Sequence, residues 1–98
     1  MPENEVFEIM QKNLNHIKFK YHVKSIGVFG SYAVNFETDG SDIDVLVEFE
    51  EGFETFDNYM DLKFYLEDIY QKKVDLVMND APINPRIKSR ILSEVKYA

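Results

Sequence analysis

Hydrophobic residues recur along the chain with two different spacings, and each spacing predicts one kind of element. Over residues 3–18 the apolar positions fall three or four residues apart, as on one face of an amphipathic helix. Residues 55–71 repeat this spacing and predict a second, long helix. A last helix is expected over residues 85–97, because Pro85 suits the first position of a helix.

Three short segments rich in β-branched and aromatic residues predict strands. They are Val23–Phe29, Ile43–Phe49 and Val74–Met78. Turn-forming residues follow the first strand at Gly30 and precede the second over residues 38–41. Helices and strands therefore alternate with short connections, which predicts an α/β layered fold.

Length and composition predict a single domain that spans residues 1–98. A chain this short leaves no room for a separate substrate-binding domain. Hydrophobic residues make up 45% of it, which is enough apolar surface for a compact core and argues against disorder.

The charge balance narrows the classes of partner. Eleven basic against eighteen acidic residues give a formal net charge of -7, so a polynucleotide would be repelled and nucleic acid is not the expected partner. The sequence has no cysteine, which excludes thiolate zinc sites and cysteine nucleophiles. It shows neither a signal peptide nor an apolar run of the roughly 20 residues that span a bilayer, so a cytoplasmic protein without a membrane partner is expected.

The turn at Gly30-Ser31 is the first candidate for chemistry. A glycine between a strand and a short following helix lets backbone N–H groups and the positive end of the helix dipole face a phosphate. A serine that merely caps a helix has the same sequence, so this turn is a weak signal when taken alone.

Asp42 and Asp44 strengthen the case for a phosphate site. They stand at positions i and i+2 at the entrance to an apolar strand, so their side chains point the same way. Two neighbouring carboxylates repel each other unless a cation lies between them. Magnesium prefers carboxylate and phosphate oxygens and would remove this repulsion. The competing interpretation is a polar turn in which both side chains cap backbone N–H groups.

Asp75 is the candidate for a third metal ligand. It is the one charged residue of its predicted strand, where an unpaired buried carboxylate would be costly. The preceding Lys72 and Lys73 offer another explanation, since either could neutralise it. Two other phosphate or metal motifs are excluded: the residues after Asp39 do not follow the order of an EF-hand loop, and Gly30 is not followed by a Walker lysine.

Taken together, Gly30-Ser31, ten further residues, Asp42-Ile43-Asp44 and the later strand acid Asp75 resemble the DNA polymerase β nucleotidyltransferase superfamily. The chain looks most like the stand-alone minimal nucleotidyltransferases, and the similarity runs from Ile26 through Tyr97. The resemblance implies a nucleotidyltransferase fold, with a small mixed β-sheet of about three to four strands packed against helices.

The same resemblance implies roles for the site residues. Gly30 and Ser31 would bind the terminal phosphates of ATP or another nucleoside triphosphate. Asp42, Asp44 and Asp75 would be catalytic and would hold two Mg²⁺ ions, with Asp75 helping to activate a hydroxyl acceptor. One segment departs from the family pattern, because Ala33-Val34-Asn35 stands where minimal members often have Ala-Arg-Gly. A cation and a flexible glycine are missing there, which would weaken triphosphate binding.

Three functions follow as hypotheses. The first is transfer of a nucleoside monophosphate, most plausibly AMP from ATP, to a hydroxyl on a partner protein. By resemblance the partner would be a small helical HEPN protein, with the two acting as antitoxin and toxin, and a tyrosine hydroxyl would be a plausible target. The second is an antitoxin that neutralises its partner by contact alone, and the third is an ATP sensor without turnover. Arg86 and Arg90 share one face of the last predicted helix and are open to a phosphate, an acidic partner or solvent.

Overall fold

The computed structural model describes residues 3–30 and 42–98. In chain order its elements are α1 (Glu3–Lys12), α2 (Leu14–Tyr21), β1 (Val23–Phe29), β2 (Ile43–Phe49), α3 (Phe56–Tyr70), β3 (Val74–Met78), α4 (Pro85–Glu94) and β4 (Lys96–Tyr97). The three predicted strands are confirmed with their bounds, and so is the α/β fold class. Among the helices of these two described ranges, none is long and apolar enough to cross a membrane.

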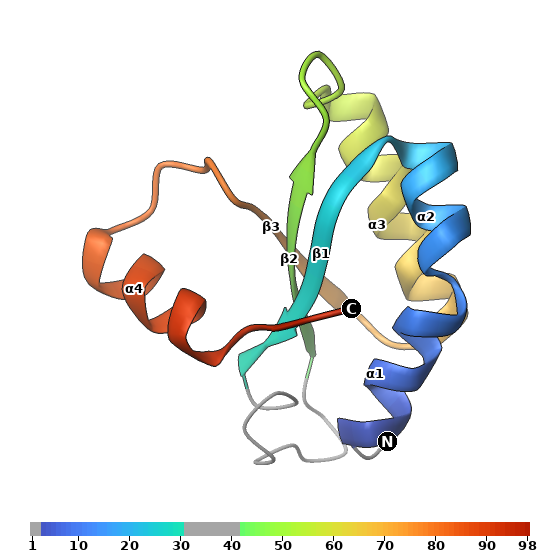
Figure 1. Cartoon of the computed structure of the whole chain (residues 1–98), viewed down its shortest axis with the longest axis horizontal. Helices are drawn as coiled ribbons and strands as arrows, with labels where there is room; N and C mark the ends of the chain where they lie inside the picture. Colours follow the sequence, from blue (N-terminus) through green and yellow to red (C-terminus); the bar gives the residue numbers. More distant parts are fainter. Residues whose placement is uncertain (1–2, 31–41) are drawn as a thin grey trace.

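One mixed sheet organises the molecule, with the strand order β3-β2-β1-β4. β1 is antiparallel to β2 and to β4, whereas β2 and β3 are parallel. The parallel pair needs a crossover connection, and α3 provides it. Helices α1, α2 and α3 lie on one side of the sheet and α4 lies on the other (Figure 1).

The alternation of side chains along β2 divides the core into two parts. Val45 and Val47 are fully buried beneath the three-helix face and belong to the main core. Leu46 points to the opposite face, where it forms a smaller cluster with Phe29 and Ile91 of α4. Asp44 has the same parity as Leu46, so its side chain is directed to the α4 face.

The prediction of one helix over residues 3–18 is wrong, because the chain forms two helices that meet at Asn13. The Asn13 side-chain amide donates a hydrogen bond to the Ile9 carbonyl at 2.8 Å, and its oxygen accepts one from the Tyr65 hydroxyl at 2.8 Å. An asparagine that bonds the backbone in this way competes with helix continuation. The apolar spacing carried no sign of this break.

The C-terminal segment also differs from its prediction. The last helix ends at Glu94, and Lys96–Tyr97 forms a short strand beside β1 instead of a final helical turn. Gly27 of β1 permits this pairing, since a Cβ atom there would lie 2.7 Å from the Lys96 carbonyl oxygen and 2.7 Å from Val95 Cγ2. A strand of two residues is too short to show an alternating pattern in the sequence, and it forms only because β1 pairs with it.

We therefore expect Gly27→Ala to destabilise the protein by about 1–3 kcal/mol, the usual cost of inserting a methyl group into a filled space. The overlap with the Lys96 backbone can be relieved only if β4 moves away from β1. Urea unfolding measures the change in free energy, and amide hydrogen exchange at residues 96–98 should increase. An unchanged urea midpoint would show that β4 packs less closely on Gly27 than the distances indicate.

Candidate functional site

Asp44 and Asp75 lie directly opposite each other on neighbouring parallel strands. Asp44 of β2 pairs in register with Asp75 of β3, and both side chains are directed to the α4 face. Asp42 lies two residues earlier, just before β2, and is exposed. The three acids named from the sequence therefore come from one end of two adjacent strands. In Figure 1 this is the lower end of the sheet, where β1 ends and β2 begins.

The argument that burial makes Asp75 costly is wrong, because its side chain is exposed. β3 is an edge strand, so among residues 3–30 and 42–98 no strand pairs with its outer side. Two side chains of α3 close that side. The Tyr59 hydroxyl donates to the Leu76 carbonyl at 2.6 Å, and Glu67 accepts from the Val74 N–H at 3.0 Å. Asp75 is thus held on an anchored strand while its carboxylate reaches solvent.

Gly30 brings the end of β1 against Asp44. Its φ of 73° lies in the left-handed region, which glycine adopts without strain. A Cβ atom at this position would overlap Asp44 Oδ2 and lie 3.0 Å from Asp44 Cγ. Glycine is therefore required twice, once by the backbone and once by the carboxylate packed against it. Ser31, the other half of the predicted phosphate turn, lies outside the described residues, as do Val34 and Asn35.

The environment of Asp44 disfavours its charged form. Burial, together with the negative charges of Asp75, Asp42 and Glu94, raises the pKa of Asp44 to about 6. Burial is the largest of these causes. A half-buried carboxylate surrounded by other carboxylates gains most from a bound cation, because the cation removes both the repulsion and the unfavourable burial of charge.

This raised pKa predicts how metal-free stability depends on pH. The folded chain holds the Asp44 proton more tightly than the unfolded chain, so protonated Asp44 adds to the free energy of unfolding at low pH. This contribution is lost as pH rises through about 6. Asp44→Asn removes this loss. We expect the metal-free variant to melt at a higher temperature than the wild type at pH 7.5, with the difference shrinking below pH 5. Thermal unfolding in EDTA at several pH values measures it, and a difference independent of pH would contradict the assignment.

The donor set fits magnesium, although the ligand-free geometry is not yet that of a metal centre. Within residues 3–30 and 42–98, no three acidic or histidine side chains are close enough together to hold an ion. Neighbouring carboxylates repel each other until a cation draws them together. Carboxylate oxygens on adjacent strands are nevertheless the kind of hard ligand that a divalent cation such as Mg²⁺ takes.

A groove of about 440 Å³ opens beside these acids, between the sheet and α4. Its floor and walls are mainly apolar, with Asp75 and Gly30 at the site end and Arg90 and Glu94 on α4; the apolar lining residues are Phe29, Val77, Ile83, Ile87 and Ile91. Arg90 Nε lies 3.1 Å from Glu94 Oε1. Sequence reasoning missed Glu94 and Ile87 as site neighbours. Their spacing on α4 was visible, but nothing local showed which face of that helix meets the sheet.

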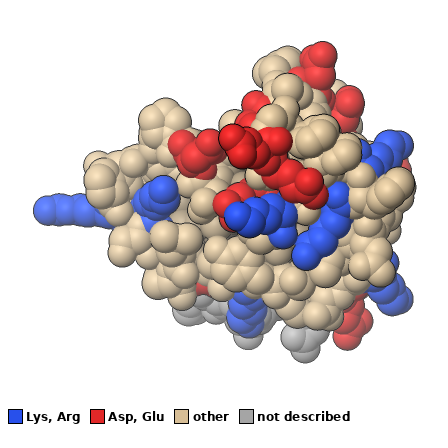
Figure 2. All heavy atoms as spheres, turned by 45° about the horizontal axis from the view of Figure 1, so that its top comes forward, with Lys and Arg blue, Asp and Glu red and all other residues tan. Residues whose placement is uncertain are grey.

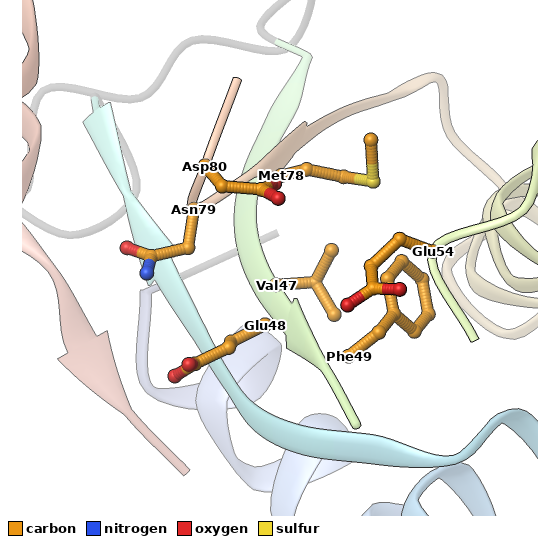
Figure 3. Close-up of a pocket in the computed structure, with 7 residues that line it drawn as sticks. All are labelled: Val47, Glu48, Phe49, Glu54, Met78, Asn79 and Asp80. Atoms are coloured by element: carbon orange, nitrogen blue, oxygen red, sulfur yellow. The ribbon is translucent and has the colours of Figure 1, made fainter. Parts of the chain in front are cut away.

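A second pocket lies at the other end of the sheet and does not suit a triphosphate. Its volume is about 80 Å³, and Glu48, Glu54 and Asp80 line it beside Asn79 (Figure 3). No lysine or arginine lines it. Acidic side chains also gather at the middle of the face shown in Figure 2. Both features agree with the net charge of -7 and oppose contact with a polynucleotide backbone.

Comparison with known proteins adds to this geometry. Residues 10–98 match the family described as Nucleotidyltransferase domain. The chain belongs to this family. It is therefore a nucleotidyltransferase by class, and the strand acids and glycine turn described above belong to a nucleotidyltransferase domain. The resemblance to minimal nucleotidyltransferases inferred from Gly30-Ser31 and Asp42-Ile43-Asp44 is confirmed.

Two relatives illustrate how far the similarity extends. A candidate protein adenylyltransferase of Methanocaldococcus jannaschii is 43% identical over 95 residues, which cover 96% of this chain and 95% of the relative. The protein adenylyltransferase MntA of Thermococcus cleftensis is 34% identical over 93 residues, covering 95% and 92% of the two chains. The nucleotidyltransferase domain here thus matches both proteins along nearly their whole length.

Solved structures share the same fold. A candidate minimal nucleotidyltransferase superposes with a TM-score of 0.80 at 29% identity, covering 98% of this chain and 95% of the other. A toxin-antitoxin structure with AMP-PNP gives 0.67 at 21%, covering 99% and 72%. A complex of a tri-AMPylated Shewanella oneidensis HEPN toxin with its MNT antitoxin gives 0.56 at 20%, covering 97% and 66%. The last two likenesses concern the fold alone.

Proposed function

We propose that this nucleotidyltransferase transfers a nucleoside monophosphate, AMP from ATP, to a hydroxyl group on a partner protein. The observation that carries the proposal is the Asp44–Asp75 pair, set across β2 and β3 with Gly30 packed against Asp44. Carboxylates and a glycine turn at one sheet end are what a metal-bound triphosphate requires. The names of the M. jannaschii and T. cleftensis relatives, both protein adenylyltransferases, support the choice of AMP and a protein acceptor.

In this proposal Asp42, Asp44 and Asp75 hold two Mg²⁺ ions, and Gly30 with Ser31 binds the terminal phosphates. When bound, such ions would supply Lewis-acid stabilisation of the charge that develops as the nucleotide phosphate is transferred. The chain's own residues place the carboxylates. Register pairing sets Asp44 opposite Asp75, and the missing Cβ of Gly30 leaves space for the Asp44 carboxylate.

The proposed partner is a HEPN-type helical protein, with this chain as its antitoxin in the cytoplasm and residues 1–98 acting as one domain. Structures of toxin-antitoxin complexes with the same fold support this choice, including one whose HEPN toxin carries AMP. The net charge of -7 supports it as well, because it makes a protein a better acceptor than a nucleic acid.

Intact-mass spectrometry tests the transfer. The purified chain is incubated with ATP, Mg²⁺ and a HEPN-type protein, and we expect that protein to gain the mass of AMP. Omitting ATP or adding EDTA should prevent the gain. If the two proteins form a stable complex and no adduct appears under any nucleotide, the transfer proposal is wrong.

The replacement of the family's Arg-Gly by Val34-Asn35 favours a second candidate, an antitoxin that acts by contact alone. The double variant Asp42→Ala and Asp44→Ala separates the two. We expect it to bind the partner but to lose neutralisation. Full neutralisation by this variant would establish the contact function instead.

A further inference from the structure

Helices α2 and α3 expose aromatic side chains on the outer face of the helical layer. The two helices lie side by side on the side of the sheet opposite α4 (Figure 1). Phe19 of α2 is 85% exposed and Phe64 of α3 is 58% exposed. One exposed phenylalanine is ordinary on a protein surface, but two on neighbouring helices form a patch of the kind that marks a contact with another protein.

A shallow hollow lies beside each of these two rings. The first hollow lies between α2 and α3 and has a volume of about 440 Å³, with Asp61 and Phe64 in its lining. The second lies along α2 and has a volume of about 530 Å³, with His16 and Phe19 in its lining. Lys20 borders both hollows. The outer face therefore carries two protruding rings and, next to each, space that a ring from another molecule can fill.

The two helices carry opposite charge. α2 has the exposed lysines Lys18 and Lys20 and no acidic residue, whereas α3 has four acidic residues and one lysine. Asp61 and Asp68 are exposed and stand three residues before and four residues after Phe64, so they share its side of α3. Among the residues that the structure describes, neither Lys18 nor Lys20 belongs to an ion pair. A basic strip and an acidic strip thus lie next to each other, both facing solvent.

The relative direction of the helices decides how such a face can meet a copy of itself. The His16 ring, early in α2, lies 5.1 Å from the ring of Tyr65. The Tyr21 carbonyl, at the end of α2, accepts a hydrogen bond from the side chain of Asn58, which lies earlier in α3 than Tyr65 does. α2 and α3 are therefore antiparallel. A two-fold axis parallel to them sets α2 of each copy against α3 of the other.

We propose that the outer face of α2 and α3 is a dimer interface that binds a second copy of this chain. Lys20 and Asp61 line the same hollow, so they lie at the same level along the two helices. The two-fold axis then sets Lys20 of each copy against Asp61 of the other. Phe19 of each copy enters the hollow beside Phe64 of the other, and Phe64 enters the hollow beside Phe19. Buried aromatic rings with charged pairs around them are the usual composition of a protein interface.

The charges favour a second copy over another kind of partner. A uniformly acidic partner would be repelled by α3, and a uniformly basic one would be repelled by α2, whereas a copy of the chain matches both helices at once. The chain has a net charge of -7, so two copies repel each other over most of their surface and need a basic strip such as α2 at which to meet.

The dimer leaves both candidate sites open. Asp44 and Asp75 are directed to the α4 face, on the other side of the sheet from α2 and α3 (Figure 1). Each dimer therefore presents two outward-facing sites. The interface goes beyond the proposed function and does not depend on it.

Sedimentation velocity of the wild-type chain tests the self-association directly. We expect the weight-average mass to rise from that of one chain toward that of two between about 10 μM and about 1 mM, the range in which a modest interface is measured. A chain that stays monomeric throughout this range would overturn the proposal.

Charge reversal tests which residues meet in the dimer. Lys20→Glu alone sets like charges against Asp61 at two symmetric places, and Asp61→Lys alone does the same against Lys20. We expect each variant to weaken dimerisation by about tenfold or more. Mixed in equal amounts, the two variants regain opposite charges at both places, so a heterodimer of near wild-type affinity should form. If the mixture stays monomeric, or if neither variant weakens the dimer, the proposed pairing is wrong.

Two exposed phenylalanines provide the matched test of the apolar contact. Phe19→Ser removes a ring from the proposed interface, whereas Phe56→Ser removes an exposed ring from the start of α3, where it lines a different hollow together with Met78. We expect Phe19→Ser to be monomeric and Phe56→Ser to dimerise as the wild type does, with urea unfolding checking that both are folded. Equal dimerisation of the two variants would contradict the proposal.

The outcomes also separate the interface from the proposed function. If the wild type dimerises and makes no AMP adduct on a HEPN-type protein, the transfer proposal fails and the interface stands. If the wild type is monomeric and Phe19→Ser loses binding to the HEPN-type protein, the face belongs to that partner and the dimer proposal is overturned.

Discussion

Replacing Asp44 with asparagine is expected to reduce AMP transfer by at least about a hundredfold, since loss of an outer-shell partner of a metal ligand alone costs 10–100-fold. Asparagine keeps the shape of the side chain beside Gly30 and removes the charge. The variant also removes an unfavourable charge, because burial and neighbouring carboxylates raise the pKa of Asp44 to about 6. A gain in metal-free stability together with a loss of transfer would exclude misfolding as the cause.

Metal binding provides the second measurement for this prediction. Magnesium or manganese should raise the melting temperature of the wild type with increasing concentration, because an ion that binds only the folded state stabilises it by mass action. Asp44→Asn should lose most of this increase. The control is Asp68→Asn, which neutralises an exposed carboxylate on α3. If Asp44→Asn keeps more than a tenth of the wild-type rate, Asp44 is not a metal ligand in the reaction.

Replacing Gly30 with alanine is expected to abolish transfer as fully as the loss of Asp44 does. The added methyl group overlaps Asp44 Oδ2, so either the carboxylate or the end of β1 must move. The backbone adds a cost of its own, because an alanine at a φ of 73° is strained by about 1–2 kcal/mol. Urea unfolding measures the stability, and the mass assay measures the transfer.

Gly52→Ala is the matched control for this variant. Gly52 has a φ of 91°, but a Cβ atom there would meet nothing within 4 Å. It therefore introduces the backbone strain without the contact to Asp44, and we expect destabilisation with transfer intact. Adding Asp44→Ala to Gly30→Ala should recover part of the stability and none of the activity. Equal activity in Gly30→Ala and Gly52→Ala would show that the Asp44 contact does not position the carboxylate.

Both predictions depend on geometry that joins three segments. Gly30 directly follows β1, and Asp44 and Asp75 are the second residues of β2 and β3. These ends meet because β2 pairs with both other strands. The Tyr59 and Glu67 side chains anchor the outer side of β3 and so keep Asp75 in register. The site is therefore a property of the sheet end, and α4 adds the wall of the groove.

Sequence reasoning worked best where a signal is local. The strands Val23–Phe29, Ile43–Phe49 and Val74–Met78 were predicted with their bounds, because short runs of β-branched residues end at clear turn residues. The helix α3 was predicted to within one residue at each end, where Thr55 and Gln71 prove to be its caps. The expectation that Asp42 and Asp44 point the same way rests on the two-residue period of a strand, and it stays a prediction because Asp42 lies just outside β2.

Errors arose where a feature depends on residues far apart in the chain. Asn13 breaks the first helix in part through Tyr65, which lies 52 positions away. β4 exists because Gly27 leaves space for the Lys96 backbone, and Asp75 lies on β3, the edge strand of the sheet that the described residues form. None of these contacts leaves a periodic pattern in the segment that it changes.

The sequence by itself determined the fold class, the three main strands and the acids that carry the proposed chemistry, because spacing along one strand or helix sets which side chains share a face. Only the tertiary structure decided that Asp44 faces Asp75, that Gly30 must lack a side chain, and that an apolar groove opens beside them under α4. Each of these features depends on contacts between segments that are far apart in the sequence, and those contacts form only when the sheet assembles.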